Sequence, residues 1–394
     1  MTVPKELPAL ETLWSPVLGD NPTLRAMLAE KPIWRVRTHT GEESWLVLGA
    51  AEIRELMLDR RLVRSHPSPT DASRLTDNPV FEMVASMGGD DPHTVHTQMR
   101  SLLIPFFTQK RMTALRPRIE SIVHDAIDHV LGQPQPVDLL PTFVLPVPLR
   151  ALCEVMGVPE EERESLGELL SRAYRDDEQS SGQTELFGHL IDLAAWKRQN
   201  PADDVISTVA AVADEDVMVA TVMYMLFVAG HESVSSHIGT GIARLLTRPD
   251  LRSALVDDPG LLPGAVEELL RTATVGGAWQ PHYAFEDLEV GGEHIRTGEL
   301  VLLDFAMANH DPRQFADPRV VDFHRSPNQH LAFAHGAWHC VGAPLARMEL
   351  ATVYSALLSR MPTLSLAVSP DQLGDPEKLK ERLSSSLAWL PVTW

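Results

Sequence analysis

The stretch FAHGAWHCVGAPLARMEL, from Phe333 to Leu350, places Cys340 in a glycine-containing loop directly before a predicted helix. The sequence has two cysteines, so cysteine alone cannot build a disulfide framework or a four-ligand metal cluster. A cysteine at the start of a helix is favoured as a thiolate by the helix dipole and by backbone N–H groups. Such a thiolate serves either as a nucleophile or as a metal ligand.

The residues around Cys340 leave both uses open. Gly336 and Gly342 permit tight turns and allow the loop to lie flat against something large. Pro344 suits the first turn of the following helix, where its missing N–H costs nothing. A nucleophile would need a histidine base, but His339 is the chain neighbour of the cysteine, and adjacent side chains diverge. The other use is as the single axial thiolate of a haem.

The composition is that of a soluble globular protein. The 394 residues are 44% hydrophobic and 22% charged, with a formal net charge of −20. This acidity argues against nucleic acid as a partner, because phosphate contacts need Lys and Arg. The N-terminus lacks the pattern of a signal peptide, and no stretch reaches the ~18 uninterrupted apolar residues of a membrane span. We therefore expect a cytoplasmic protein with no membrane partner.

Apolar spacing predicts a mainly α fold with small sheets. Helical periodicity extends over Pro117–Leu131 and Arg150–Met156. The longest helical pattern runs from about Asp214 to Leu246 and is apolar on almost all sides, which places it at the centre of the protein. Residues 61–89 resemble a long loop with a short helix, and residues 286–303 a set of short strands. Because no linker or repeat divides the chain, we expect a single domain over residues 1–394.

Three further patterns carry chemistry. The sequence AGHES (residues 229–233) puts polar groups inside the longest helix, where they mark a kink, a cavity or a site. Glu268 and Arg271 lie three residues apart on one helix face and can form an ion pair. His96 and Arg100 lie four residues apart and stack two cationic donors on one face, which suits paired carboxylates such as haem propionates.

In this order the patterns closely resemble the cytochrome P450 family, specifically its soluble bacterial branch. The resemblance extends over nearly the whole chain and includes ANHDPRQFADP (residues 308–318) and the terminal LPVTW. It implies the cytochrome P450 fold, with a long central helix over the haem. It also implies haem b (iron protoporphyrin IX), dioxygen, and NAD(P)H-derived electrons delivered by ferredoxin and ferredoxin reductase.

The resemblance assigns the cofactor-binding residues. Cys340 would be the axial ligand of the haem iron, with Phe333 packed near it and Gly336 and Gly342 allowing close approach. The propionates would be bound by three side chains, His96, Arg100 and His282. A buried salt-bridge network of Glu268, Arg271 and Arg325 would hold the surrounding structure.

The resemblance also assigns catalytic residues on the long helix. Ala229 and Gly230 would make room for dioxygen, and Glu232 and Ser233 would form an acid–alcohol pair that delivers protons. The family usually has Thr where this chain has Ser233. Serine keeps the hydroxyl but loses the methyl group that restricts its rotamer, so proton delivery is expected to be looser.

The chain departs from the family pattern near the cofactor as well. His282 stands where an Arg usually binds a propionate, and Trp338 replaces the usual basic residue two positions before the cysteine. Ala334 stands where Gly is common. Two of the usual propionate anchors are thus weakened, and Trp338 is expected to pack rather than to bind a carboxylate.

The substrate pocket is expected, by analogy with the family, to draw on four separate parts of the chain. Its candidate residues are Phe81, Met83, Val84, Met87, Val228, Val275, Gly276, Gly277, Trp279, Leu387 and Trp389. The two glycines would widen the space beside the haem, and Trp279 and Trp389 could stack on an aromatic ring. A bulky, largely apolar or aromatic natural product is the expected substrate.

Three functions follow from this reading. The first is monooxygenation, by hydroxylation or epoxidation of a secondary metabolite. The second is oxidative C–C or C–N coupling of aromatic substrates, for example tryptophan-containing cyclic dipeptides, without oxygen insertion. The departure at Ser233 favours the second without deciding between them. The third, a haem-based sensor or binding protein, leaves Glu232 and Ser233 without a purpose.

Overall fold

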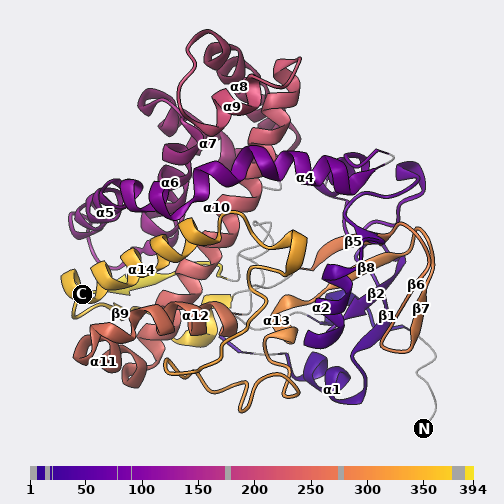
Figure 1. The fold of residues 1–394 in the computed structure, drawn as a ribbon. Coiled ribbons are helices and arrows are strands. Elements are labelled where there is room, and N and C mark those ends of the chain that lie inside the picture. Colours follow the sequence, from indigo (N-terminus) through magenta and orange to yellow (C-terminus); the bar gives the residue numbers. More distant parts are fainter. Residues whose placement is uncertain are drawn as a thin grey trace. The chain divides into compact units, whose positions relative to one another are not determined.

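The computed structural model describes residues 7–13, 18–19, 21–77, 79–89, 91–173, 179–273, 279–374 and 387–394. The chain divides into two compact units, each built from two distant segments (Figure 1). The first unit comprises residues 1–101 and 267–340, and the second comprises residues 102–266 and 341–394. That the whole chain acts as one domain stays a prediction.

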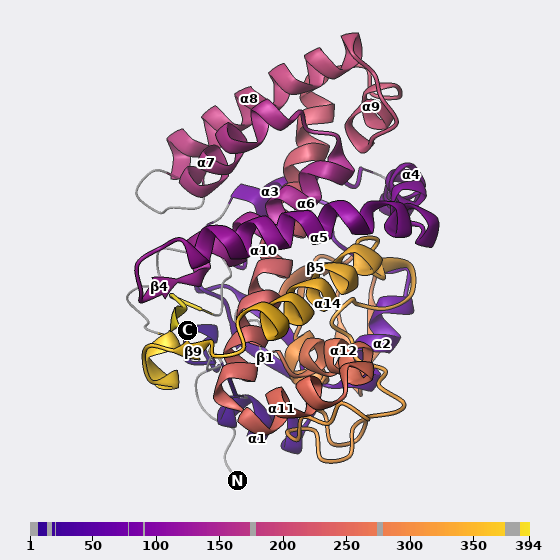
Figure 2. The same cartoon turned by 90° about the vertical axis from the view of Figure 1, so that its left-hand side faces the viewer.

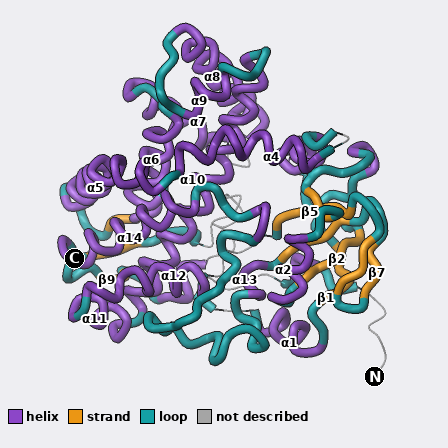
Figure 3. Tube along the Cα trace, viewed as in Figure 1, coloured by secondary structure: helices purple, strands orange, loops and turns teal. Residues whose placement is uncertain are grey.

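The first unit combines short helices with most of the strands, as Figure 3 shows by colour. Its helices are η1 (Leu10–Thr12), α1 (Pro22–Glu30), α2 (Ala50–Leu58), η2 (Pro69–Asp71), α3 (Pro79–Ser86), α13 (Phe305–Ala308) and η7 (Gly336–Trp338). Its strands are β1 (Ile33–Arg37), β2 (Glu43–Val47), β3 (Leu62–Val63), β5 (Gln280–Ala284), β6 (Leu288–Val290), β7 (Glu293–Ile295) and β8 (Leu300–Leu303). Helix α4 (Pro92–Leu103) lies in this unit up to Ser101.

Five of these strands form one sheet in the order β1-β2-β8-β5-β3. Strand β2 pairs in parallel with β8, and the other neighbours pair antiparallel. Successive side chains of β2 enter different cores, as the period of two in a strand requires. Trp45 and Val47 pack in the cluster that includes α2, whereas Leu46 packs in the cluster that includes α1.

The second unit is mainly helical. Its helices are η3 (Ile104–Phe107), α5 (Gln109–Leu131), η4 (Leu140–Val144), α6 (Pro146–Met156), η5 (Glu160–Glu162), α7 (Arg163–Ala173), α8 (Gln179–Gln199), α9 (Val205–Ala210), α10 (Asp216–Thr247), α11 (Pro249–Asp257), η6 (Pro259–Leu261), α14 (Ala343–Arg360) and η8 (Pro370–Gly374). Strands β4 (Val137–Asp138), β10 (Pro391–Thr393) and β9 (Ser365–Leu366) form a small sheet in that order. Helix α12 (Leu262–Thr272) begins in this unit and ends in the first.

Helix α10 is the core helix of the second unit. It contacts α6, α8, α9 and α14, and the last of these also packs along α5 (Figure 2). Its length and apolarity alone would also allow it to span a membrane. In the structure, part of this apolar stretch is buried against the neighbouring helices of the second unit.

The structure confirms the predicted mainly α class with small sheets. Helix α10 begins two residues after Asp214 and ends one residue after Leu246, and the 61–89 segment contains the short helix α3. Helix α5 begins at Gln109 rather than at Pro117, because the Thr108 side chain accepts a hydrogen bond from the Arg111 N–H and caps an earlier start. The predicted 286–303 segment contains β6, β7 and β8, whereas β1, β2, β3, β4, β9 and β10 were not predicted.

Candidate functional site

The cysteine loop closes on itself within the first unit. The Cys340 N–H donates a hydrogen bond to the Phe333 carbonyl oxygen at 2.9 Å, and the buried Phe333 ring lies 6.3 Å from the His339 ring. Cys340 itself is exposed. The backbone thus holds the thiol on the outside of a short, fixed turn, where its sulfur can ligate a metal or react.

Two positive φ angles shape this turn. Gly336 has φ +60°, and a Cβ atom there would lie 2.8 Å from Leu58 and 3.2 Å from the Met57 carbonyl oxygen. Glycine is therefore required both by conformation and by the close approach of α2. Ala334 has φ +57°, a left-handed conformation that is unfavourable for alanine. Gly342, the N-cap of α14, has φ −79°, which any residue adopts, so its backbone conformation does not require glycine.

His96 and Arg100 both lie on α4, but their environments differ. Arg100 donates a hydrogen bond from Nη1 to the His339 carbonyl oxygen at 2.7 Å, which joins α4 to the cysteine loop. His96 stacks on Trp338, with ring centroids 4.1 Å apart. Burial, assisted by the nearby Arg100, lowers the pKa of His96 to about 4. The expectation of two stacked cations was therefore wrong: His96 is neutral near pH 7 because Trp338 helps to bury it.

His282 lies on β5 and is almost fully buried. Its Nδ1 atom lies 2.9 Å from the Gln280 carbonyl oxygen, and its ring meets Trp338 edge to face at 5.9 Å. Burial, with a contribution from the Arg64 charge, lowers the pKa of His282 to about 3. Like His96, it is neutral near pH 7, whereas an arginine there would be a cation. Trp338 packs between the two histidines, in line with the expectation that it packs.

The predicted network around Glu268 is confirmed. The Glu268 carboxylate accepts bonds from Arg271 at 2.7 and 2.8 Å, from Arg325 at 3.0 Å and from Asn328 at 3.0 Å. The Glu268 and Arg271 side chains are both completely buried. Burial alone would raise the pKa of Glu268, but the hydrogen bonds from Arg271 and the Asp322 N–H hold it below its usual value. The carboxylate therefore stays charged and fixes the segment that precedes the cysteine loop.

On α10 in the second unit, the AGHES residues keep the helix continuous and present alternate faces. Ala229 and Ser233, one turn apart, are exposed, although their helix is the core of the unit. The Ser233 hydroxyl donates to the Ala229 carbonyl oxygen at 2.7 Å. Glu232 is half-buried beside them. The Ser233 hydroxyl and the half-buried Glu232 carboxylate thus lie next to each other along α10, and their role in proton delivery stays a prediction.

Gly230 and His231 face the protein interior. A Cβ atom on Gly230 would lie 3.2 Å from the Leu152 side chain of α6, so its small size serves helix packing within the unit. The predicted role of Gly230 in making room for dioxygen stays a prediction. His231 is buried, and its Nε2 atom lies 2.9 Å from the Leu145 carbonyl oxygen. Burial lowers the pKa of His231, so it is a neutral structural group.

The predicted pocket residues have varied positions. On α3, Met83 and Val84 are half-buried, Phe81 packs against the core of the first unit, and Met87 is exposed, as a turn residue. Trp279 is buried in that core, and its Nε1 donates to the buried Asp304 carboxylate at 2.8 Å. Its ring is thus used for packing, which differs from the expected stacking on a substrate. Val275, Gly276 and Gly277 lie outside the described residues.

The remaining pocket candidates belong to the second unit. Leu387 is buried beside Gly239 of α10, where a Cβ would lie 2.6 Å from the leucine. Trp389 is half-buried and donates from Nε1 to the Gln372 carbonyl oxygen at 2.8 Å. Val228 is half-buried on α10.

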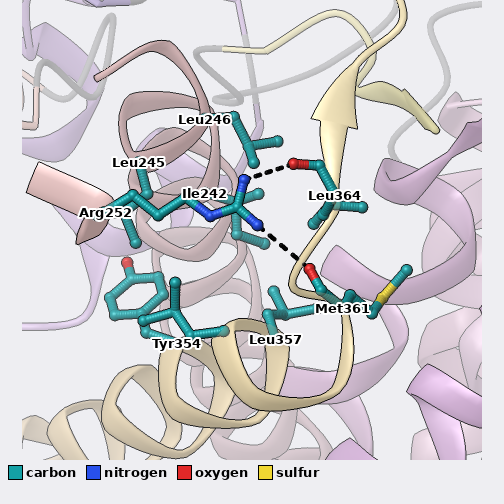
Figure 4. Close-up of a pocket in the computed structure, with 9 residues that line it drawn as sticks. Ile242, Leu245, Leu246, Arg252, Tyr354, Leu357, Met361 and Leu364 are labelled. Atoms are coloured by element: carbon teal, nitrogen blue, oxygen red, sulfur yellow. Dashed lines mark hydrogen bonds between the residues drawn. The ribbon is translucent and has the colours of Figure 1, made fainter. Parts of the chain in front are cut away.

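A separate apolar cavity in the second unit holds about 20 Å³. It is lined by Ile242, Leu245, Leu246, Arg252, Tyr354, Leu357, Leu358, Met361 and Leu364 (Figure 4). Arg252 closes it by donating to the carbonyl oxygens of Leu364 at 2.7 Å and Met361 at 3.3 Å. The volume suffices for about one water molecule. It is therefore a packing defect between α10 and α14 rather than a substrate site.

The donor set fits a porphyrin-bound metal. Within the described ranges, no three His, Cys, Asp or Glu side chains come together as metal ligands. A metal held by Cys340 would thus take its other ligands from its own cofactor. Arg64, which sequence reasoning missed, adds a buried Nε atom to the nitrogen atoms of His96, Arg100 and His282, and this atom has no hydrogen-bond partner in the part of the chain that the structure describes. A carboxylate-bearing macrocycle over a thiolate satisfies both observations.

Fold and donor set together define a haem-thiolate protein. The family model for cytochrome P450 matches residues 260–387. The chain is 37% identical to pentalenolactone synthase of Streptomyces exfoliatus, over 99% of this chain and 100% of that protein. It is 36% identical to cytochrome P450 CYP105Q4 of Mycobacterium marinum, over 95% of this chain and 92% of the other. The chain belongs to the cytochrome P450 family and is an oxidoreductase that carries haem iron.

Solved structures confirm the cytochrome P450 fold. The substrate-free cytochrome P450 PimD, a polyene macrolide antibiotic pimaricin epoxidase, matches with a TM-score of 0.87 and 37% identity, over 98% of this chain and 99% of that one. The putative thioether synthase SgvP, from the tailoring step of griseoviridin, matches with a TM-score of 0.85 and 33% identity, over 96% and 97%. Enzymes of this family use dioxygen, redox partners and small-molecule substrates, which agrees with the sequence prediction.

Proposed function

We propose that this cytochrome P450 hydroxylates or epoxidises a bulky, largely apolar natural product of secondary metabolism. The observation that carries the proposal is its similarity, along nearly its full length, to enzymes named for these reactions. Besides the pimaricin epoxidase, the mycinamicin IV hydroxylase/epoxidase of Micromonospora griseorubida is 36% identical over 92% of this chain and 93% of that protein.

The cofactor in this proposal is haem b, with Cys340 as its axial ligand. The exposed thiol on a fixed turn supports this role, as does the close packing of Gly336 against α2. Arg100 would bind a propionate as a cation, and His96 as a neutral N–H donor. The Nδ1–H of His282 faces the Gln280 carbonyl oxygen, so His282 would donate to a propionate from Nε2 only when its ring is protonated. Phe333 would shield the sulfur side, and Gly342 would allow close approach. When bound, the haem iron supplies activation of dioxygen, and a thiolate ligand favours O–O cleavage.

The protein's part in the reaction is to move protons and exclude water. Ser233 and Glu232 would form the donor pair, with the Ser233 hydroxyl held by the Ala229 carbonyl at 2.7 Å. In that bond the hydroxyl is the donor, so its oxygen can still accept a hydrogen bond from a carboxylic acid. Ala229, exposed one turn away, carries no bulk that would block the same face.

We propose ferredoxin and ferredoxin reductase as redox partners, and the cytoplasm as location. The three basic residues Lys110, Arg111 and Arg347 are candidates for contact with an acidic ferredoxin. Arg111 donates two bonds of 2.6 Å to Asp203, which reduces its share of the positive charge.

Oxidative coupling without oxygen insertion is the second candidate. Two observations favour it: serine in place of threonine at 233, and 33% identity to a putative thioether synthase. The sequence supports aromatic substrates such as tryptophan-containing cyclic dipeptides more than the structure does. In the structure the Trp279 ring, which was expected to stack on such a substrate, is buried, and its N–H is bonded to Asp304.

The experiment is a screen of natural-product substrates by the low-to-high-spin shift of the haem, followed by turnover under labelled dioxygen. A product that gains labelled oxygen supports hydroxylation or epoxidation. A product that loses hydrogens only supports coupling. A carbon monoxide spectrum of the reduced protein that lacks the band of a thiolate-ligated haem would overturn the assignment of Cys340.

A further inference from the structure

Arg64 follows strand β3 directly and lies opposite His282. The β3–β5 pairing joins Leu62 to Ala284 and Val63 to Tyr283, so the same register places residue 64 across from residue 282. The Arg64 guanidinium donates from Nη2 to the Gln280 side-chain oxygen. Because the Gln280 carbonyl contacts the His282 ring, one glutamine orients both side chains.

The Arg64 charge lacks compensation. Among the described residues, its buried Nε atom has no hydrogen-bond partner and no carboxylate pairs with its guanidinium. Desolvation lowers the pKa of Arg64 to about 10, which still leaves the guanidinium charged at neutral pH. A half-buried cation whose Nε donor is buried and unused is less favourable than one that an anion pairs with.

No neighbouring group described in this region supplies the negative charge that would compensate Arg64. His96 and His282 are neutral, and the Arg64 charge itself helps to lower the pKa of both. Arg100 already donates to the His339 carbonyl. Trp338 contacts both histidines and offers only an indole N–H. Arg64 is thus a cation close to His282, one of the positions where this chain departs from its family.

We propose that Arg64 binds a haem propionate and replaces the cationic anchor that His282 and Trp338 do not provide. The guanidinium fork suits a carboxylate, because two parallel N–H donors can meet its two oxygens. The proposal rests on the haem site described under the proposed function.

The test compares Arg64→Gln with Arg61→Gln as a matched control. Arg61 lies three residues earlier on the same segment but is partly exposed and paired with Asp59 at 2.6 Å. Haem loss from the purified holoenzyme to excess apomyoglobin is followed by absorbance. We expect Arg64→Gln to accelerate haem loss on the order of tenfold, as for loss of one charge-assisted hydrogen bond, and Arg61→Gln to leave it unchanged. Arg64→Lys, which keeps the charge without the fork, should fall between them.

A second arm separates propionate binding from a structural role. Protein loaded with the dimethyl ester of haem lacks the propionate charges, so Arg64→Gln should then lose haem at the wild-type rate. The haem-free Arg64→Gln protein should unfold at the wild-type temperature or higher, because an uncompensated cation has been removed. Equal haem loss in wild type and Arg64→Gln would overturn the inference, as would an unchanged effect with the diester. If the wild type itself binds no haem, the proposed function fails instead.

Discussion

The indole of Trp338 lies against the imidazole of His96, with ring centroids 4.1 Å apart and planes inclined by 32°. This contact joins the cysteine loop to α4 within the first unit, and it explains why a histidine at a propionate position is neutral. The same indole meets His282 edge to face at 5.9 Å. One aromatic residue thus changes the electrostatics of two candidate cofactor contacts.

Stability of the haem-free protein should depend on pH through these histidines. Folding lowers the pKa of His96 to about 4 and of His282 to about 3, so only the unfolded chain takes up protons as the pH falls below 6.5. The free energy of unfolding should therefore fall between pH 6.5 and 4, by up to ~1.4 kcal/mol per histidine and pH unit. Thermal unfolding across this range checks the prediction.

The matched variants are His96→Asn and His282→Asn, each of which should show a shallower decline than the wild type. Haem-loaded protein should also show a shallower decline, because propionates would favour the protonated imidazoles. An identical pH dependence in all four samples would contradict the assigned pKa shifts.

Removing one partner of the buried Glu268 network should cause a large loss of stability. Glu268→Ala would leave Arg271 fully buried without its carboxylate, and the expected cost is about 3–5 kcal/mol in stability. Arg325→Ala should cost less, because Arg325 is partly exposed and Arg271 still satisfies Glu268. Soluble yield and thermal unfolding of the two variants measure this order. A loss at Arg325 equal to that at Glu268 would show that the network is not organised around the carboxylate.

Backbone strain at Ala334 predicts a stabilising substitution. With φ at +57°, alanine is in the left-handed region, which costs about 1–2 kcal/mol relative to the right-handed one. Ala334→Gly removes this strain but adds unfolded-state entropy, so we expect a net gain of about 0–1 kcal/mol. Gly336→Ala is the reverse control, because it combines φ +60° with a 2.8 Å contact to Leu58 and should destabilise clearly. Thermal unfolding of both variants should move in opposite directions.

Proton delivery by Ser233 can be tested by the yield of product per NAD(P)H consumed. Ser233→Thr should raise this yield several-fold, because the added methyl group restricts the hydroxyl rotamer. Ser233→Ala should lower the yield and increase the release of peroxide. Ser235→Ala is the control: its hydroxyl makes a similar 2.8 Å bond to the His231 carbonyl but is buried. An equal product yield per NAD(P)H in the wild type and the three variants would show that Ser233 does not deliver protons.

Much of this fold could be predicted because its signals are local. The apolar run that forms α10, the glycine loop around Cys340 and the i, i+3 pair of Glu268 and Arg271 each lie within a short window. The features that sequence reasoning missed arise from long-range contacts. The neutral state of His96 depends on Trp338, more than two hundred residues away. Likewise, the position of Arg64 depends on the register between β3 and β5.

Glu349 on α14 provides a last prediction, independent of the cofactor. Its side chain is almost fully buried, and its Oε2 atom has no hydrogen-bond partner among the described residues. Burial raises the pKa of Glu349 well above its usual value, so the folded protein holds a proton there that the unfolded chain releases above pH 4.5. The wild type should therefore lose stability as the pH rises from 4.5 toward the folded-state pKa. Glu349→Met removes both this linkage and the unsatisfied oxygen, and it should stabilise the protein by about 1–3 kcal/mol at pH 7.

The gain should shrink toward pH 4, whereas Glu168→Gln, at an exposed position of α7, should have little effect at either pH. Thermal unfolding at pH 4 and pH 7 provides the comparison, and a gain that does not change with pH would show that Glu349 is ionised in the folded protein.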